Sequence, residues 1–174
     1  FLSGINIVKE KEIGTIEQIN VTPIHKVQFI IGKLLPFWII ANVELALGLA
    51  FGRWVFHIPV EGSLWVVFGF AAVYLLAVLG LGLFISTVTE TQQQAMLVSY
   101  FFLVVFILMS GLFTQIENMP PWAQKITWFN PVAYFIEVMR MVLLKGSGWY
   151  AIRGHLLAVA GLATGLNLLA VLNY

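Results

Sequence analysis

Cysteine is absent from the 174 residues of this chain, and charge is scarce. Without a thiol, the chain has no disulfide, no thiolate metal site and no cysteine nucleophile. Only 10% of the residues are charged, while 60% are hydrophobic and the mean hydropathy is +0.94. This composition differs strongly from that of a soluble globular domain and is typical of an integral membrane protein. The net charge of +1 gives no indication of a nucleic-acid partner.

The sequence motifs of several enzyme classes are also missing. No GxxxxGK[ST] loop occurs, so the chain by itself does not bind ATP in that manner. Neither an HExxH pair nor a GxSxG frame occurs, so no catalytic residue and no intramembrane hydrolase is predicted. His25, His57 and His155 are isolated in the sequence, and we expect them at the membrane interface rather than at a metal.

Four apolar runs are long enough, or nearly so, to cross the roughly 30 Å of hydrocarbon that about 20 helical residues span. They are residues 34–56, 64–87, 95–113 and 152–172. Because backbone groups in lipid must be satisfied internally, helices fit such runs. The sequence therefore predicts an all-α integral membrane protein, a polytopic helical bundle. We interpret residues 1–8 as the end of a further, truncated span.

Seven of the seventeen charged residues lie between Lys9 and Lys33. Within this stretch, Thr15 and Gln18 fit a capping box, which predicts a short helix beginning at Thr15. Thr22-Pro23 predicts a second, amphipathic helix that lies along the membrane surface and turns inward near Pro36. A solvated loop with interfacial lysines is the alternative interpretation.

Residues 114–149 are neither a clean span nor an ordinary loop. Asn130-Pro131 indicates a helix start and Gly146 a stop, so residues 131–145 form a helix too short to cross the bilayer. We expect this helix to be re-entrant or interfacial, with Glu137 and Arg140 as an ordinary local pair. The expected interfacial aromatic belt consists of Trp122, Trp128, Tyr134, Trp149 and Tyr150.

Glu44 lies near the middle of an apolar run, where an ionised carboxylate costs about 3 kcal/mol on insertion scales. It should face a partner or water, either for substrate or proton coupling or, when protonated, for an interhelical hydrogen bond. Gly161 and Gly165 form a GxxxG, which we expect to pack within the chain rather than on a second copy. Gly80, Gly82 and Ser86 are expected at further close helix contacts.

Three stretches in the same order resemble the ABC-2 type transporter permeases, particularly their bacterial multidrug-efflux branch. They are EKEIGTIEQINVTP followed by GKLLP, then GLGLFISTVTETQQQA, and finally SGLFTQIENMPPWAQKITWFNPVAYF. The resemblance implies that residues 9–33 form a cytoplasmic coupling segment and residues 114–149 an extracytoplasmic gate. It also supplies the orientation, because the lysine and arginine residues are nearly balanced between the two sides.

By the same resemblance, the coupling segment would dock on a separate ABC ATPase subunit that carries ATP and Mg²⁺, while this chain binds no cofactor. The coupling residues so implied are Glu10, Glu12, Gly14, Thr15, Glu17, Gln18, Thr22 and Pro23. The gate residues so implied are Gly111, Glu117, Asn118, Met119, Pro120, Asn130 and Pro131.

The implied function is export of a drug-like or lipid-like substrate across the bacterial inner membrane by a multi-pass permease, paired with a second copy or a related permease. An alternative is an ion-coupled secondary transporter that uses Glu44. A second alternative is a membrane subunit that has a structural role and transports nothing.

Overall fold

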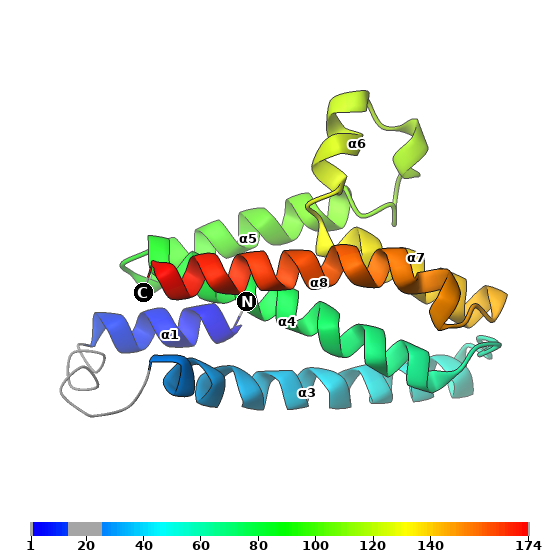
Figure 1. Ribbon diagram of the computed structural model, residues 1–174, viewed down its shortest axis with the longest axis horizontal. Coiled ribbons are helices and arrows are strands. Elements are labelled where there is room, and N and C mark those ends of the chain that lie inside the picture. Colours follow the sequence, from blue (N-terminus) through cyan, green and yellow to red (C-terminus); the bar gives the residue numbers. More distant parts are fainter. Residues whose placement is uncertain (1, 14–25, 174) are drawn as a thin grey trace.

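The computed structural model describes residues 2–13 and 26–173, and within these ranges its secondary structure is entirely helical (Figure 1). The elements are α1 (Leu2–Glu12), α3 (Lys26–Val55), α4 (Leu64–Val88), α5 (Gln92–Leu108), the 3₁₀ turn η1 (Ile116–Asn118), α6 (Pro121–Thr127), α7 (Pro131–Lys145) and α8 (Trp149–Leu172). The predicted all-helical bundle is confirmed.

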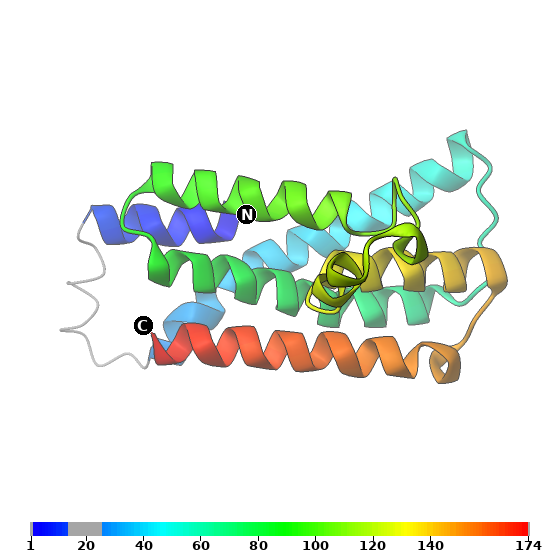
Figure 2. The same cartoon turned by 90° about the horizontal axis from the view of Figure 1, so that it is seen from above.

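Helix α4 lies at the centre of the bundle and contacts α1, α3, α5, α7 and α8. Figure 2 shows α5 and α8 on opposite sides of α4, and Figure 1 shows α3 along a third side. The core forms where α4, α7 and α8 meet, around Phe70, Val138, Val142, Ile152 and Val159, each of them fully buried. Half of the most apolar stretch of α4 is buried, compared with 6% for α3. Helix α3 therefore leaves most of its surface to lipid or to another chain.

Three of the described helices are long and apolar enough to cross a membrane: Ile30–Val55, Leu64–Val88 and Trp149–Leu172. Helix α5 is shorter than predicted, because it ends at Leu108 and has 17 residues, or about 25 Å. The Ser110 hydroxyl donates to the Ile107 carbonyl at 2.6 Å, and Gly111 has a φ of 80°, which turns the chain out of the helix. The prediction of a span up to residue 113 is therefore wrong.

The polar stretch before α3 is divided differently from the prediction. Lys9 to Glu12 form the last turn of α1, and Lys26 to Lys33 form the first turns of α3. Helix α3 continues through Pro36, so the expected turn at this residue is wrong. The helix can continue because proline removes only a single helix hydrogen bond. Two residues further, the indole of Trp38 donates to the Ala72 carbonyl at 3.1 Å and fastens this part of α3 to α4.

Six of the eight implied coupling residues lie outside the described residues, as does the capping box. They are Gly14, Thr15, Glu17, Gln18, Thr22 and Pro23.

The glycines of α4 pack closely, whereas those of α8 do not. A Cβ on Gly80 would lie 2.4 Å from the Asn167 amide nitrogen, and one on Gly82 would lie 3.1 Å from the Ser3 hydroxyl, so these two predicted contacts are confirmed. A Cβ on Gly161 or Gly165 would meet nothing within 4 Å. The predicted packing of this GxxxG within the chain is wrong, because α8 turns a different face, which includes Val159 and Ala163, toward the core.

Candidate functional site

The acidic end of α1 contacts the beginning of α5. One carboxylate oxygen of Glu12 accepts hydrogen bonds from the backbone N–H of Gln92 at 3.3 Å and from its side-chain amide at 2.9 Å. Gln92 is the first residue of α5, where backbone N–H groups lack intrahelical partners and negative charge is favourable. Glu12 thus caps α5 from another part of the chain, and the first two motifs of the sequence touch at this point.

Two further contacts join the same end of α1 to its neighbours. Lys11 donates to the Thr89 carbonyl, in the α4–α5 connection, at 3.3 Å. Glu10 forms an ion pair with Lys33 of α3, and their side chains are only 20% and 37% exposed. The Thr89 hydroxyl in turn donates to Ile85 of α4 at 2.8 Å. The end of α1 is therefore linked to α3, α4 and α5. We call this end of the bundle, where Glu10, Lys11 and Glu12 make these contacts, the coupling end.

At its other end, α5 is linked to α7 through Asn130. This side chain is 1% exposed, and its oxygen accepts from the Val132 N–H at 3.0 Å, which makes it the N-cap of α7. Its amide nitrogen donates to the Phe106 carbonyl of α5 at 2.8 Å. Pro131 occupies the first helical position and Gly146 ends the helix with a φ of 62°, so the predicted helix is confirmed at both ends.

Arg140 supplies a second link to this end of α5. Its guanidinium donates to the Gly111 carbonyl at 3.2 Å. The expected pairing of Arg140 with Glu137 is wrong, because Glu137 instead contacts His155 of α8, with 3.1 Å between Oε2 and Nε2. The two side chains of α7 reach different neighbours, α5 and α8. They share a polar pocket of about 310 Å³ with Gly111 and Glu117.

Tyr134 lies one turn before Glu137 on α7. Its hydroxyl donates to the Trp128 carbonyl at 3.1 Å, and its ring meets that of His155 edge to face. Burial raises the pKa of the Tyr134 hydroxyl, and the negative charge of Glu137 raises it further.

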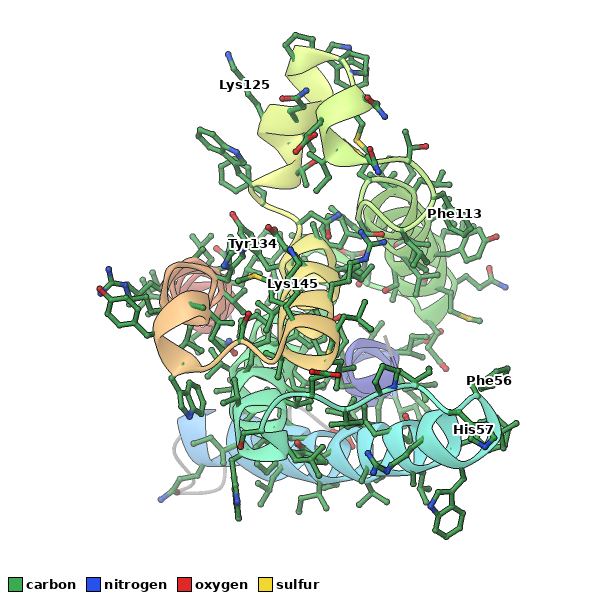
Figure 3. The ribbon with its side chains drawn as sticks, turned by 90° about the vertical axis from the view of Figure 1, so that its right-hand side faces the viewer. Phe56, His57, Phe113, Lys125, Tyr134 and Lys145 are labelled. Carbon is green, nitrogen blue, oxygen red and sulfur yellow. The ribbon has the colours of Figure 1, made fainter. Side chains whose placement is uncertain are left out.

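The remaining residues that the resemblance implies for the gate belong to the part that projects from the bundle, η1 and α6 (Figures 1 and 3). Glu117 and Asn118 are exposed in η1. The Met119 carbonyl accepts from the Gln124 amide at 2.9 Å, and Pro120 precedes the first turn of α6. The structure thus brings Gly111, Asn130 and Pro131 together at the end of α5, and places Asn118 and Pro120 in the projection.

Lys125 marks the outer tip of this projection in Figure 3, far from His57 at the end of α3. The aromatic side chains predicted for the belt are largely exposed, with Trp122 at 65%, Trp128 at 70% and Tyr150 at 77%. Their exposure fits a position at headgroup depth.

Glu44 is exposed on α3 and has no hydrogen-bond or ion-pair partner among the described residues. One turn further, a Cβ on Gly48 would meet nothing within 4 Å. The face of α3 that carries Glu44 and Gly48 points away from the rest of the chain, as expected for a carboxylate that requires a partner or water from elsewhere. Within the described ranges, no group of three or more His, Cys, Asp or Glu side chains is arranged to hold a metal ion.

The pairings at both ends of α5 are absent from the sequence predictions. Gln92, Arg140 and Phe106 are joined to residues far away in the chain, at separations of 80, 29 and 24 positions. The sequence contained one indication of the Glu12–Gln92 contact: each residue lies in a stretch that resembles the permease family, Glu12 in the first and Gln92 in the second.

Three long apolar helices, α3, α4 and α8, define a polytopic helical membrane protein. Polar side chains link the two ends of the shorter helix α5 to the other helices. Comparison with known families agrees and is more specific. The chain belongs to the ABC-2 type transporter family, whose model matches residues 1–144. No solved structure matches it.

Several curated relatives are named as permeases. The chain is 37% identical over 144 residues to the "Probable multidrug ABC transporter permease YbhR" of Escherichia coli, which covers 83% of this chain and 39% of the relative. It is 29% identical to the "Probable multidrug ABC transporter permease YbhS" of Escherichia coli, over 84% of this chain and 39% of the relative. It is 25% identical to the "Inner membrane transport permease YhhJ" over 99% of this chain and 46% of the relative. The chain therefore spans less than half the length of these relatives.

Proposed function

We propose that this chain is part of the permease subunit of an ATP-driven exporter in a bacterial inner membrane. A separate ATPase subunit, which carries ATP and Mg²⁺, docks within the segment of residues 9–33, on residues 14–25 between α1 and α3, which we call the docking segment. Two permease copies, or two related permeases, form the pathway for a drug-like or lipid-like substrate. The printed names of YbhR and YbhS, which describe multidrug ABC transporter permeases, support this proposal.

The observation that carries the proposal is the contact between Glu12 and Gln92. Residues 14–25 begin directly after the end of α1 and lead directly into α3. A displacement of this segment by a docked ATPase would act on α5 through Glu12 and on α3 through the Glu10–Lys33 ion pair. In this role Glu10 and Glu12 link the docking segment to the bundle.

Helix α5 then carries the displacement to the gate. Its far end is joined to α7 by Asn130 at the Phe106 carbonyl and by Arg140 at the Gly111 carbonyl. Because hydrogen-bonded helices are stiff along their axis, a movement at Gln92 reaches Phe106 within the same helix and passes to α7 through Asn130. The gate residues Gly111, Asn130 and Pro131 lie where that movement arrives.

The test is a double-mutant cycle in the full-length permease, co-expressed with its ATPase and reconstituted in vesicles. Glu12→Ala and Gln92→Ala should each keep ATPase association but reduce ATP-driven export of a fluorescent amphipathic drug about fivefold, near the value of one hydrogen bond. The double variant should be no worse than Glu12→Ala, because Glu12 accepts both hydrogen bonds and Gln92→Ala removes only the one from the side-chain amide. Glu17→Ala, within the docking segment, should weaken ATPase association itself.

Gln93→Ala is the matched control, since Gln93 is an exposed neighbour with no hydrogen bond among the described residues. It should export like the wild type. Unchanged association and unchanged export in the Glu12, Glu17 and Gln92 variants would refute the coupling role.

The exposed, unpartnered carboxylate of Glu44 favours one second candidate, ion-coupled transport. This alternative predicts export driven by a proton gradient without any ATPase, and loss of that export in Glu44→Gln. The exporter proposal predicts no export without the ATPase in either protein.

A further inference from the structure

A cavity of about 280 Å³ lies within this single chain, between α4, α5 and α7. It is separate from the coupling end and from the polar pocket of Arg140. Its walls are apolar and partly aromatic, with Tyr74 from α4 and Phe102 and Phe106 from α5. Leu103 also lines the cavity and is 43% exposed, so the cavity opens on the surface of the bundle beside α5.

One side chain in this wall has unused hydrogen-bonding capacity. Ser99 is 5% exposed, lines the cavity, and its hydroxyl has no hydrogen-bond partner. Serine and threonine inside helices usually donate to a carbonyl three or four residues earlier. Six other side chains of the described residues do so: Ser86, Thr87, Thr89, Ser110, Thr127 and Thr164. Ser99 departs from that pattern at the place where its helix borders the cavity.

A second hydroxyl lies in the same walls. The Tyr74 ring stacks on Phe135 at 4.5 Å between centroids, and its hydroxyl makes no hydrogen bond to the described residues. No charged side chain lines the cavity. The site therefore combines ring surfaces with hydroxyl groups that can both donate and accept.

We propose that this cavity binds a small aromatic alcohol, a compound of one or two rings with a single hydroxyl group. The volume lies near the lower end of ligand pockets, which suits one or two rings. The rings pack against Phe102 and Phe106, whose own rings meet edge to face. The Ser99 hydroxyl oxygen is itself buried and has no hydrogen-bond partner, so the side chain turns into the cavity to pair with the ligand hydroxyl. A lipid tail would fill the space but leave that hydroxyl unpaired, and an ion would meet no opposite charge.

The cavity touches both sides of the junction between α5 and α7. Ser99 and Phe106 belong to α5, while Pro131 and Val132 begin α7. A bound ligand would therefore hold together the two helices that Asn130 already joins. The site does not depend on the proposed transport, because binding requires neither the ATPase nor ATP.

The test uses the full-length protein in phosphatidylcholine nanodiscs and two fluorescent probes, 2-naphthol and naphthalene, with empty nanodiscs subtracted. We expect saturable binding of 2-naphthol that is five- to tenfold weaker in Ser99→Ala, the range of one neutral hydrogen bond. Naphthalene should bind more weakly than 2-naphthol, and equally to the wild type and Ser99→Ala. Ser99→Phe, which places a ring in the cavity, should abolish binding of both probes.

Ser86→Ala is the matched control, because Ser86 is 1% exposed, lies outside the cavity and donates to the Leu83 carbonyl of its own helix at 2.6 Å. Its affinity for 2-naphthol should stay within twofold of the wild type. Wild-type affinity in Ser99→Ala, or 2-naphthol uptake no greater than in empty nanodiscs, would overturn the proposal. Equal affinity of the unmodified protein for both probes would also overturn it, and that comparison needs no variant to fold.

Discussion

Replacement of Asn130 tests the junction between α5 and α7 most directly. The side chain performs two tasks, since its oxygen caps α7 at Val132 and its amide nitrogen donates to Phe106. The Phe106 carbonyl depends on this donor. The Ser110 N–H, which would reach it in a continuing helix, is bonded to the Ile107 carbonyl instead.

The magnitude follows from these two tasks. Loss of a helix N-cap costs about 1 kcal/mol, and the partly buried Phe106 carbonyl left without its donor costs about 1–3 kcal/mol. Asn130→Ala should therefore destabilise the junction by roughly 2–4 kcal/mol. Asn130→Ser keeps an oxygen for the cap but loses the amide, so only the second contribution should disappear.

Hydrogen–deuterium exchange of the full-length protein, followed at the amides of residues 132–135, measures this effect locally. Exchange should accelerate roughly 30- to 1,000-fold in Asn130→Ala, at 1.4 kcal/mol for each factor of ten. Asn130→Ser should be intermediate. Asn118→Ala, an exposed position in η1, should match the wild type. If Asn130→Ser exchanged as slowly as the wild type, the bond to Phe106 would contribute nothing and the reasoning would fail.

Three further changes test the packing and electrostatics of the bundle. Gly4→Ala should lower the apparent melting temperature, because its Cβ would lie 2.7 Å from a backbone oxygen of α4. Such overpacking lowers the free energy of unfolding by about 1–3 kcal/mol. Gly161→Ala should leave the melting temperature unchanged, because its Cβ would meet nothing within 4 Å. Glu137→Gln should lower the pKa of Tyr134 in a tyrosinate absorbance titration, yet leave it above 10.0 because burial is its first cause. Since this raised pKa disfavours the phenolate in the folded protein, the wild type should lose stability as the pH rises above 10.0, and Glu137→Gln should lose less. Trp38→Phe should cost about 1 kcal/mol in thermal unfolding, because the indole donor to α4 is lost.

The helices themselves were readable from the sequence because their signals are local. Asn130-Pro131 and Gly146 mark the ends of α7 correctly, since a cap and a left-handed glycine act within a single turn. The long apolar runs identify α3, α4 and α8 as spans because the length required is set by the membrane.

Pairings between helices were not readable in this way. Glu137 and Arg140 are three residues apart, which suggests a local pair, yet Glu137 contacts His155 of α8 and Arg140 donates to the Gly111 carbonyl beyond the end of α5. The GxxxG of α8 marks a face able to pack closely but does not say against what, and this chain leaves that face open. Glu12 and Gln92 belong to motifs quoted from the sequence, but only the fold shows that they touch.

The contrast between α3 and α5 has a consequence for the order in which the protein is made. Helix α3 has only 6% of its most apolar stretch covered by the rest of the chain, so its position in lipid depends little on the helices that follow it in the sequence. Helix α5 is short, begins with three glutamines and relies on Glu12, Asn130 and Arg140 for its two ends. Its final position is therefore reached only after α7 has been synthesised.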